Sequence, residues 1–350
     1  DAFELLHRYG NSSVAHMTTW PGNTLLLNHH RDAYIAYRLI GDVALVLGDP
    51  IGSPDGCAAA IREFTHLTRH RGWTPCFYGV GEALRAEYAR NGLAMMHVGE
   101  DAYIDLPALD LRGRRWQDAR TAINRARRSG IELELVDASQ IDPDILRQLR
   151  EISDAWLRAK RMSEMGFTLG SLSGEPDPEV RFAVAIDDQR QVHGFVTWLP
   201  IHGTGGWVID IMRRRPDAFN GIMEFLIISS ALAFRDEGAP FVSLATAPLA
   251  RVEREGEEIG TVEQAVIGLA GLVEPVYGAH SLFEFKNKFS PRWEPVYIAY
   301  PGASVLPKIG YAIVRAYMPD LGLNTLRDLV GGAQNTPDAH AKLAPPTPAS

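Results

Sequence analysis

An aspartate and three consecutive arginines stand where a strand pattern gives way to a helix pattern. The stretch is VIDIMRRRPDAFNGIMEFLI, residues 208–227, in which Asp210 precedes Arg213, Arg214 and Arg215. An unpaired buried carboxylate is costly, so Asp210 needs either a partner or an opening. It could form an internal ion pair with Arg213 or another arginine. Alternatively, it could face a cleft and orient a hydroxyl or ammonium group, while the arginines bind phosphate.

The residues after this strand add polar groups at the start of the helix. Strict strand alternation would place Asp210 and Arg213 on opposite faces of the strand. Asn220 is the expected N-cap of the helix, and Gly221 would let a ligand approach the backbone. Glu224 lies one turn further on, so it could face the same cleft or simply favour the helix N-terminus.

A second group of cations lies among aromatic residues in HSLFEFKNKFSPRWEPVYIAY, residues 280–300. Its cations are Lys286, Lys288 and Arg292. A phosphate with sugars or bases nearby would suit such a mixture. The competing interpretation is that the aromatic residues belong to the core and the lysines form a solvated rim.

A third group is the arginine-rich stretch LRGRRWQDARTAINRARRSG, residues 111–130, in which Asp118 is the only acid. Such a run is either a solvated helix face or an electrostatic footprint for a nucleic-acid backbone. The second interpretation makes Arg120, Arg125, Arg127 and Arg128 candidate RNA contacts.

Two weaker signals remain. The loop GDPIG, residues 48–52, follows a strand pattern and makes Asp49 a candidate substrate contact, although short glycine loops are common. The histidines lack metal-ligand spacing, so they are interpreted as surface or cap residues and no metal site is expected.

The composition limits the class of protein. The chain has 350 residues, 46% of them hydrophobic, which is enough for two ordinary domains or one large one. Its net charge of −8 means that a polyanion would need a local basic patch. The two cysteines fit a reducing compartment. No apolar run approaches the roughly 20 residues that a transmembrane helix requires.

The order of elements suggests a duplication. Strands are expected at 25–28, 33–39 and 43–47, followed by a loop, a helix at 57–70 and a strand at 74–78. The same order recurs with strands at 182–186, 192–199 and 206–212, a helix at 221–236 and a strand at 241–244. It is the order of GNAT-like acyltransferases, an analogy of fold. The expected domains are residues 1–140, including the basic helix, and 141–330, with a disordered tail at 331–350.

Five stretches, in order, resemble the synthase domain of bacterial aminoacyl-phosphatidylglycerol synthases, the lysyl- and alanyl-transferring enzymes. They are AYRLIGDVALVLGDPIG, AINRARRSG, MGFTLG, DIMRRRPDAFNGIMEFLI and FKNKFSPRWEPVYIAY. The resemblance implies an α/β fold of two GNAT-like units in tandem. In the family's D-x-x-R pair the matching residues are Asp210 and Arg213, and in its K-x-K-F segment Lys286 and Lys288. One departure is Val296, where the family often has arginine.

The resemblance also implies a function. It is transfer of an amino acid, lysine or alanine, from aminoacyl-tRNA to a glycerol hydroxyl of phosphatidylglycerol, with no cofactor. Family members act at the cytoplasmic face of the membrane and usually carry an N-terminal membrane region that flips the lipid, which this sequence lacks. The alternatives are a Fem-type transferase acting on a peptidoglycan precursor, an acyl-CoA N-acyltransferase, and a non-catalytic tRNA- or lipid-binding module. The bulky RRRPDAFNG loop disfavours the acyl-CoA enzyme.

Overall fold

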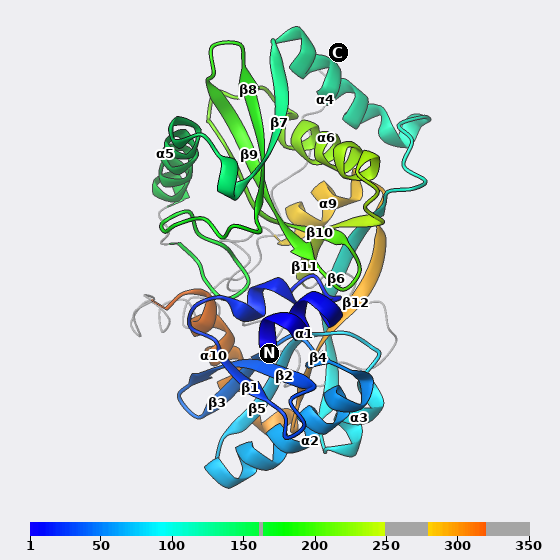
Figure 1. The fold of residues 1–350 in the computed structure, drawn as a ribbon, viewed down its shortest axis with the longest axis vertical. Coiled ribbons are helices and arrows are strands. Elements are labelled where there is room, and N and C mark those ends of the chain that lie inside the picture. The colour runs from blue at the N-terminus through cyan, green and yellow to red at the C-terminus, as the bar shows by residue number, and fades with distance from the viewer. Residues whose placement is uncertain (161–163, 249–278, 320–350) are drawn as a thin grey trace, which may run out of the picture.

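The computed structural model describes residues 1–160, 164–248 and 279–319. Its central feature is one mixed sheet of twelve strands, ordered β1-β2-β3-β5-β12-β6-β11-β10-β9-β8-β7, with β4 paired to β2. In Figure 1 the first half of the chain, in blue and cyan, lies below the green second half along the long axis of the molecule.

The first half follows the expected order closely. Its elements are α1 (Ala2–Tyr9), η1 (His16–Thr19), β1 (Thr24–Leu27), β2 (Ala33–Ile40), β3 (Val43–Leu47), β4 (Ile51–Gly52), α2 (Pro54–Arg71), β5 (Thr74–Val80), α3 (Arg85–Arg90) and β6 (Ala94–Asp105). Helix α2 begins three residues earlier than expected because Ser53 is its N-cap and accepts a hydrogen bond from the Gly56 amide at 3.0 Å. The helix crosses over the sheet, so β5 pairs with β3 in parallel.

The second half repeats this order. Its elements are β8 (Arg181–Asp187), β9 (Val192–Ile201), β10 (Gly206–Arg214), α6 (Ile222–Asp236), β11 (Phe241–Pro248), α9 (Ala279–Asn287) and β12 (Arg292–Tyr300). The repeat confirms the expected tandem GNAT-like fold.

Three elements connect the halves: η2 (Arg114–Trp116) with α4 (Gln117–Arg128), β7 (Ile131–Asp137), and α5 (Pro143–Lys160), which follows η3 (Ala138–Gln140). Helix α4 packs on α6, and β7 pairs with β8, so the basic helix lies against the second half of the sheet. The boundary at residue 140 stays a prediction.

The two halves exchange their last strands. Strand β12, the last in the chain, lies between β5 and β6 of the first half and is antiparallel to both. Strand β6 pairs on its other side with β11 of the second half. Each half therefore lacks a complete sheet of its own, because its last strand completes the neighbouring half.

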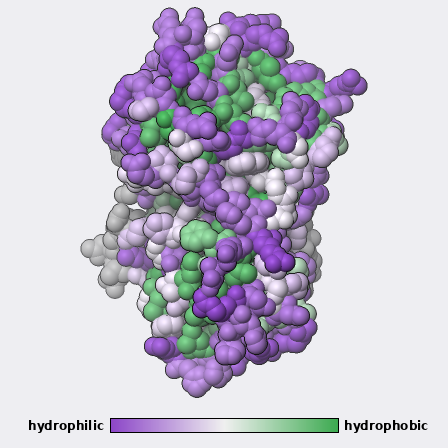
Figure 2. Space-filling model, in the orientation of Figure 1, coloured by the Kyte–Doolittle hydropathy of each residue, from purple (hydrophilic) through white to green (hydrophobic). Residues whose placement is uncertain are grey.

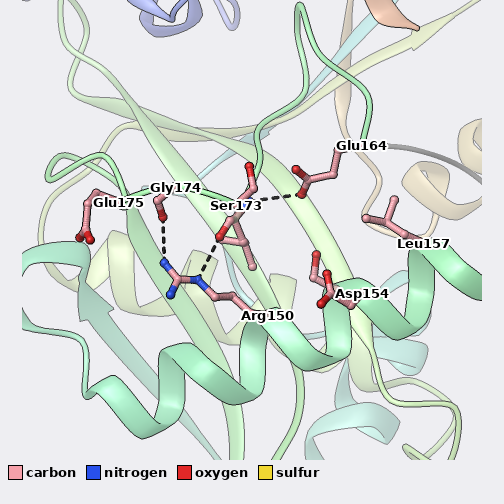
Figure 3. Close-up of a pocket in the computed structure, with 9 residues that line it drawn as sticks. Arg150, Asp154, Leu157, Glu164, Ser173, Gly174 and Glu175 are labelled. Carbon is pink, nitrogen blue, oxygen red and sulfur yellow. Dashed lines mark hydrogen bonds between the residues drawn. The ribbon is translucent and has the colours of Figure 1, made fainter. Parts of the chain in front are cut away.

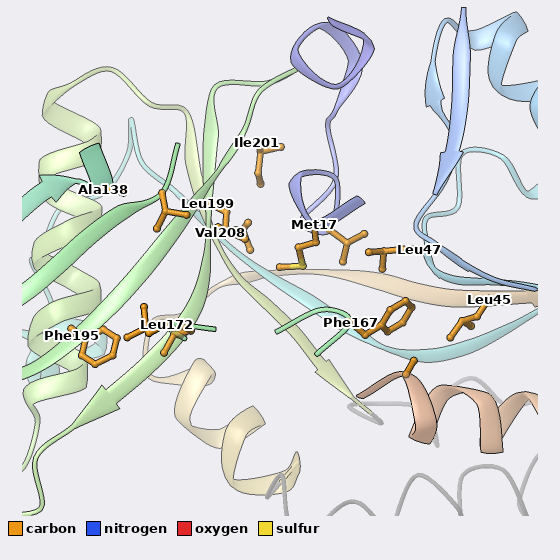
Figure 4. Packing of buried hydrophobic residues seen from close by; sticks show 14 of the residues in the cluster. Met17, Leu45, Leu47, Ala138, Phe167, Leu172, Phe195, Leu199, Ile201 and Val208 are labelled. Carbon is orange, nitrogen blue, oxygen red and sulfur yellow. The ribbon is translucent and has the colours of Figure 1, made fainter. Parts of the chain in front are cut away.

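The largest hydrophobic core cluster also spans both halves. Figure 4 shows Leu45 and Leu47 of β3 and Met17 of η1 in the same cluster as Phe195 of β9 and Val208 of β10. Burial on this scale, at about 25 cal/mol per Å² of apolar surface, makes the halves one cooperative unit.

Helix α10 (Leu306–Tyr317), which follows η5 (Ala303–Val305), belongs to this core as well. Its buried residues include Leu306 and Ile309, and Lys308 forms an ion pair with Asp42 at 2.7 Å. The apolar face of α10 is therefore used inside the protein.

The sequence patterns missed several elements. Residues 94–105, 131–137 and 292–300 form strands β6, β7 and β12, which the expected order of elements did not include. The tail at 331–350 lies outside the described residues.

The described surface exposes few large hydrophobic side chains. On the face in Figure 2 hydrophilic residues predominate, and the exposed large hydrophobic side chains among the described residues are Phe3, Leu39 and Tyr311. Within the same residues, every helix is too short or too polar to cross a bilayer.

The strand exchange predicts that the first half cannot fold without the last strand. A chain ended at residue 278 loses β12 and leaves β5 and β6 without their shared partner. We expect this chain to show no cooperative thermal transition by circular dichroism, whereas a chain ended at residue 330 should melt like the full chain. A cooperative transition in the shorter chain, within a few degrees of the full chain, would contradict the exchange.

Candidate active site

The sheet is split between β10 and β11. These parallel strands pair at Trp207 with Val242 and at Val208 with Ser243, and make no further pair along their described lengths. Directly beyond these pairs both strands carry an irregularity, between Ile209 and Met212 in β10 and between Ser243 and Thr246 in β11. Bulges of this kind often lie beside active sites, where they re-aim side chains.

The β10 bulge changes which face its side chains occupy. Asp210 Oδ1 accepts a hydrogen bond from the Gly170 amide at 2.8 Å, and Thr197 Oγ1 donates to Oδ2 at 3.4 Å. Arg213 also reaches the α5 side of the sheet, where its guanidinium contacts Ser153. The expectation from strict alternation was therefore wrong, because an extra residue in the bulge brings Asp210 and Arg213 to the same face.

The Asp210 carboxylate is poorly solvated but not sealed. Its side chain is half-buried, and this burial raises its pKa to about 6, although the Gly170 amide, Thr197 and the charge of Arg213 act in the opposite direction. A Cβ atom on Gly170 would lie 2.1 Å from Asp210 Oδ2, so only glycine allows this approach. Gly170 belongs to the MGFTLG stretch, whose role the sequence alone did not reveal.

Arg213 is held firmly behind Asp210. Its side chain is only 9% exposed and its guanidinium lies 5.0 Å from the Trp156 ring centroid. Glu164 lies 4.0 Å away, and burial lowers the pKa of Arg213. Asp210 and Arg213 thus form an electrostatically coupled pair without a direct hydrogen bond between them in the described contacts.

A cavity of about 720 Å³ adjoins this pair (Figure 3). It shares Ser153 and Glu164 with the surroundings of Arg213, and Asp154 and Glu175 also line it. The one cation in its lining, Arg150, donates to the carbonyls of Leu172 at 3.0 Å and Gly174 at 2.8 Å. The cavity therefore presents three carboxylates, an acidic character that no sequence motif indicated.

Lys286 lies on the other side of the split. It is 3% exposed and donates to the carbonyls of Ala245 at 3.0 Å and Thr246 at 2.8 Å, within the β11 bulge. Burial lowers its pKa to about 7, and the negative charge of Asp101 partly offsets this effect. Ala245 has φ of 61°, so the backbone is strained where its carbonyl turns toward the lysine.

The remaining predicted cations have carboxylate partners. Lys288 forms an ion pair with Glu224 at 2.8 Å, and Arg292 is paired with Asp105 and Glu294. No hydrogen bond or ion pair joins Asp210 to Lys286 or Lys288 in the described part of the chain. The structure thus brings Asp210 together with Arg213, and Lys288 together with Glu224.

The start of α6 differs from the expectation. The N-cap is Gly221, with φ of 105°, and Asn220 is exposed and does not cap the helix. Glycine is needed there because side chains rarely adopt this φ. Ala122 of α4 lies beside it, 3.6 Å from where a Gly221 Cβ would be.

The predicted RNA-binding arginines divide into two kinds. Arg120 donates to the carbonyls of Leu111 and Gly113, and Arg125 donates to the Asn220 carbonyl at 2.7 Å. Both side chains therefore stabilise the local backbone. Arg127 and Arg128 are exposed, and no described carboxylate lies within ion-pair distance of either.

The Asp49 carboxylate accepts hydrogen bonds from other parts of the protein. Its Oδ2 accepts from the Gly81 amide at 2.8 Å and its Oδ1 from the Tyr88 hydroxyl at 2.7 Å. Burial raises its pKa to about 6. A substrate contact for Asp49 stays a prediction, as do the substrate contacts of Asn220, Gly221, Glu224 and Arg292.

Comparison with known sequences identifies the family of this chain. The profile of the family described as phosphatidylglycerol lysyltransferase, C-terminal, matches residues 3–300. The chain belongs to this family. An uncharacterized protein of Corynebacterium glutamicum is 32% identical over 92% of this chain and 41% of its own length. The lysylphosphatidylglycerol biosynthesis bifunctional protein LysX of Mycobacterium marinum is 29% identical over 89% of the chain, and the chain spans 28% of it.

Solved structures of this phosphatidylglycerol lysyltransferase family have the same fold. The C-terminal domain of a putative lysylphosphatidylglycerol synthetase from Agrobacterium fabrum superposes with a TM-score of 0.80, at 26% identity over 91% of this chain and 96% of that one. L-PGS from Bacillus licheniformis also gives 0.80, at 26% identity over 90% and 94%. FemX, at 8% identity over 88% and 98%, has a TM-score of 0.58 and shares the fold.

The raised pKa of Asp210 predicts a pH-dependent stability difference. Above about pH 6 the folded protein holds a charged, poorly solvated carboxylate, whereas in the unfolded chain this carboxylate has its ordinary pKa of 3.8. Stability linked to this group therefore increases as pH falls from above 6 toward 4. Asp210→Asn, which keeps an acceptor for the Gly170 amide, should have a higher melting temperature than wild type at pH 8, and the difference should disappear near pH 4. A variant that is less stable at pH 8 and recovers toward pH 4 would contradict the desolvation account.

Proposed function

We propose that this domain transfers an aminoacyl group from aminoacyl-tRNA to a glycerol hydroxyl of phosphatidylglycerol. The observation that carries the proposal is the Asp210–Arg213 pair, placed by the β10 bulge beside the split of the sheet in a chain of the phosphatidylglycerol lysyltransferase family.

The proposed chemistry is an ester exchange. The lipid hydroxyl oxygen attacks the ester carbonyl carbon, and the bond between that carbon and the tRNA ribose oxygen breaks. Asp210, with a pKa near 6, is mostly ionised at pH 7 and can accept the hydroxyl proton, which then passes to the departing ribose oxygen. Holding both reactants in place can contribute about 7–11 kcal/mol to lowering the barrier.

Arg213 supplies fixed positive charge next to this proton transfer. Ser153 and the Trp156 ring hold its guanidinium, so it needs little reorganisation as negative charge develops. In the proposal Arg213 stabilises either the oxyanion or a nearby phosphate. Lys286 is buried and its ammonium is engaged by the Ala245 and Thr246 carbonyls, so in the proposal it stabilises the β11 bulge beside the split.

The adjoining cavity favours a cationic amino acid. Asp154, Glu164 and Glu175 line it, and its arginine is engaged by backbone carbonyls. A lysyl ammonium would gain charge-assisted hydrogen bonds there, whereas an alanyl group would leave the carboxylates unmatched. We therefore propose lysine in preference to alanine.

A transfer assay tests the proposed function directly. The full chain is incubated with phosphatidylglycerol vesicles and a mixture of charged tRNAs, and the chloroform-soluble products are identified by mass. We expect lysyl-phosphatidylglycerol, at least about 100-fold less of it with Asp210→Asn, and no change with the exposed control Asp42→Asn. The rate should fall as pH drops through about 6, because Asp210 becomes protonated.

The assay has clear contradicting outcomes. Product that stays in the aqueous phase would indicate a Fem-type acceptor, and binding of charged tRNA without any product would indicate a non-catalytic module. Equal rates for wild type and Asp210→Asn would remove Asp210 from the chemistry.

The basic helix predicts a salt-dependent contribution to tRNA binding. Replacing Arg127 and Arg128 with Gln should weaken binding of an acceptor-stem helix and reduce the slope of log affinity against log salt by about 1.5. The matched control is Arg62→Gln with Arg71→Gln, which removes the same charge from α2. An unchanged slope for the α4 variant, or an equal loss for the control, would contradict a local RNA contact.

A further inference from the structure

Three histidines and two acids meet where the N-terminal segment contacts the second half. His7 comes from α1, His16 from η1, and His202 directly follows β9, while Asp177 and Glu179 precede β8. The backbone is also joined here, since the Gly203 amide donates to the Gly10 carbonyl at 2.8 Å. In Figure 1 α1 lies at the level where the blue and green halves meet. The expectation that the histidines are surface or cap residues was wrong for His16, which is 2% exposed.

The distances around Glu179 fit a tetrahedral metal ion. Glu179 Oε1 lies 3.2 Å from His7 Nε2 and 3.4 Å from His202 Nε2, and one ligand atom from each of these three residues lies within 4.8 Å of the others. Ligand atoms about 2.1 Å from a tetrahedral Zn²⁺ ion are about 3.4 Å apart. The three side chains therefore need little movement to share one ion.

The hydrogen bonding leaves a ligand atom available. His202 Nε2 is buried and has no hydrogen-bond partner in the described residues, and it lies 3.4 Å from the Glu179 oxygen that His7 Nε2 also approaches. The imidazole rings of His7 and His202 are stacked, with centroids 4.1 Å apart.

The neighbouring pair extends the cluster inward. His16 Nε2 and Asp177 Oδ2 are 2.8 Å apart, and both residues lie close enough to Glu179 to form a second set of three ligands. Buried His16 also contributes to the electrostatic environment of Asp210. A carboxylate paired with an imidazole beside a metal site commonly fixes the orientation of the ligands.

From this arrangement we infer that His7, Glu179 and His202 form a Zn²⁺-binding site, supported by the His16–Asp177 pair. Imidazole and carboxylate ligands suit this ion, and the exposed His7 leaves the site accessible from solvent. Bound zinc would tie α1 to the end of β9 and so fasten the N-terminal segment to the second half. The site is separate from the ester chemistry, and no step of that chemistry requires it.

The test uses the full chain without a polyhistidine tag, stripped of metal by a chelator. Zinc binding is measured by titration calorimetry, and melting temperature is measured with and without zinc. We expect one ion per chain and a higher melting temperature with zinc, since a ligand that binds the folded state stabilises it. Cobalt substituted for zinc should give the strong visible absorption of a tetrahedral site.

Two variants and one control locate the site. His7→Ala, at an exposed position, and Glu179→Gln should each weaken zinc binding at least about tenfold and remove the thermal shift. The control is His66→Ala with His70→Ala, because this exposed pair on α2, with Nε2 atoms 3.1 Å apart, is another place where histidines could chelate zinc. It should bind zinc like wild type.

Three results would overturn the inference. They are absence of zinc binding to the wild-type chain, equal binding by wild type and both site variants, and loss of binding in the α2 control. Because each metal-free variant is melted on its own, a folding defect is recognised separately from a loss of zinc affinity.

Discussion

The proposed active site depends on one constraint. A bulge in the middle of the sheet keeps a carboxylate partly out of water. The irregularity in β10 turns Asp210 to the face that Arg213 occupies, and the Gly170 amide approaches too closely for any residue but glycine. Desolvation raises the pKa of Asp210, and the nearby arginine keeps it ionisable. Without the bulge the same two residues would face opposite sides of the sheet and could not act together.

The rest of the fold supplies the rigidity that this arrangement needs. The exchange of β6 and β12 builds one sheet from two similar halves, and the second bulge, in β11, holds Lys286 opposite β10. Two irregular strands side by side would be a weak point in an isolated sheet. Here each is paired on its outer side with a long strand, β9 or β6, so the split can stay open without loss of the fold.

Much of this fold could be predicted from the sequence, but the decisive geometry could not. The apolar run bounded by glycine turns located β3 to the residue, and the repeated order of elements indicated the tandem fold. Strand β12 was missed because its aromatic and basic residues resemble a binding segment. Asp210 and Arg213 were wrongly assigned to opposite faces because a bulge depends on pairing with β9, which periodicity does not contain. The acidic cavity and the histidine cluster join residues far apart in the chain, so no local pattern indicated them.

The most direct measurement is a carbon-13 NMR titration of the Asp210 carboxyl group, assigned by comparison with a chain lacking it. The account predicts an apparent pKa near 6 in the folded protein, moving further upward when Thr197 is replaced by valine, since one hydrogen bond to the ionised form is lost. A value at or below the ordinary 3.8 in the wild-type protein would contradict the claim that the bulge holds a poorly solvated carboxylate.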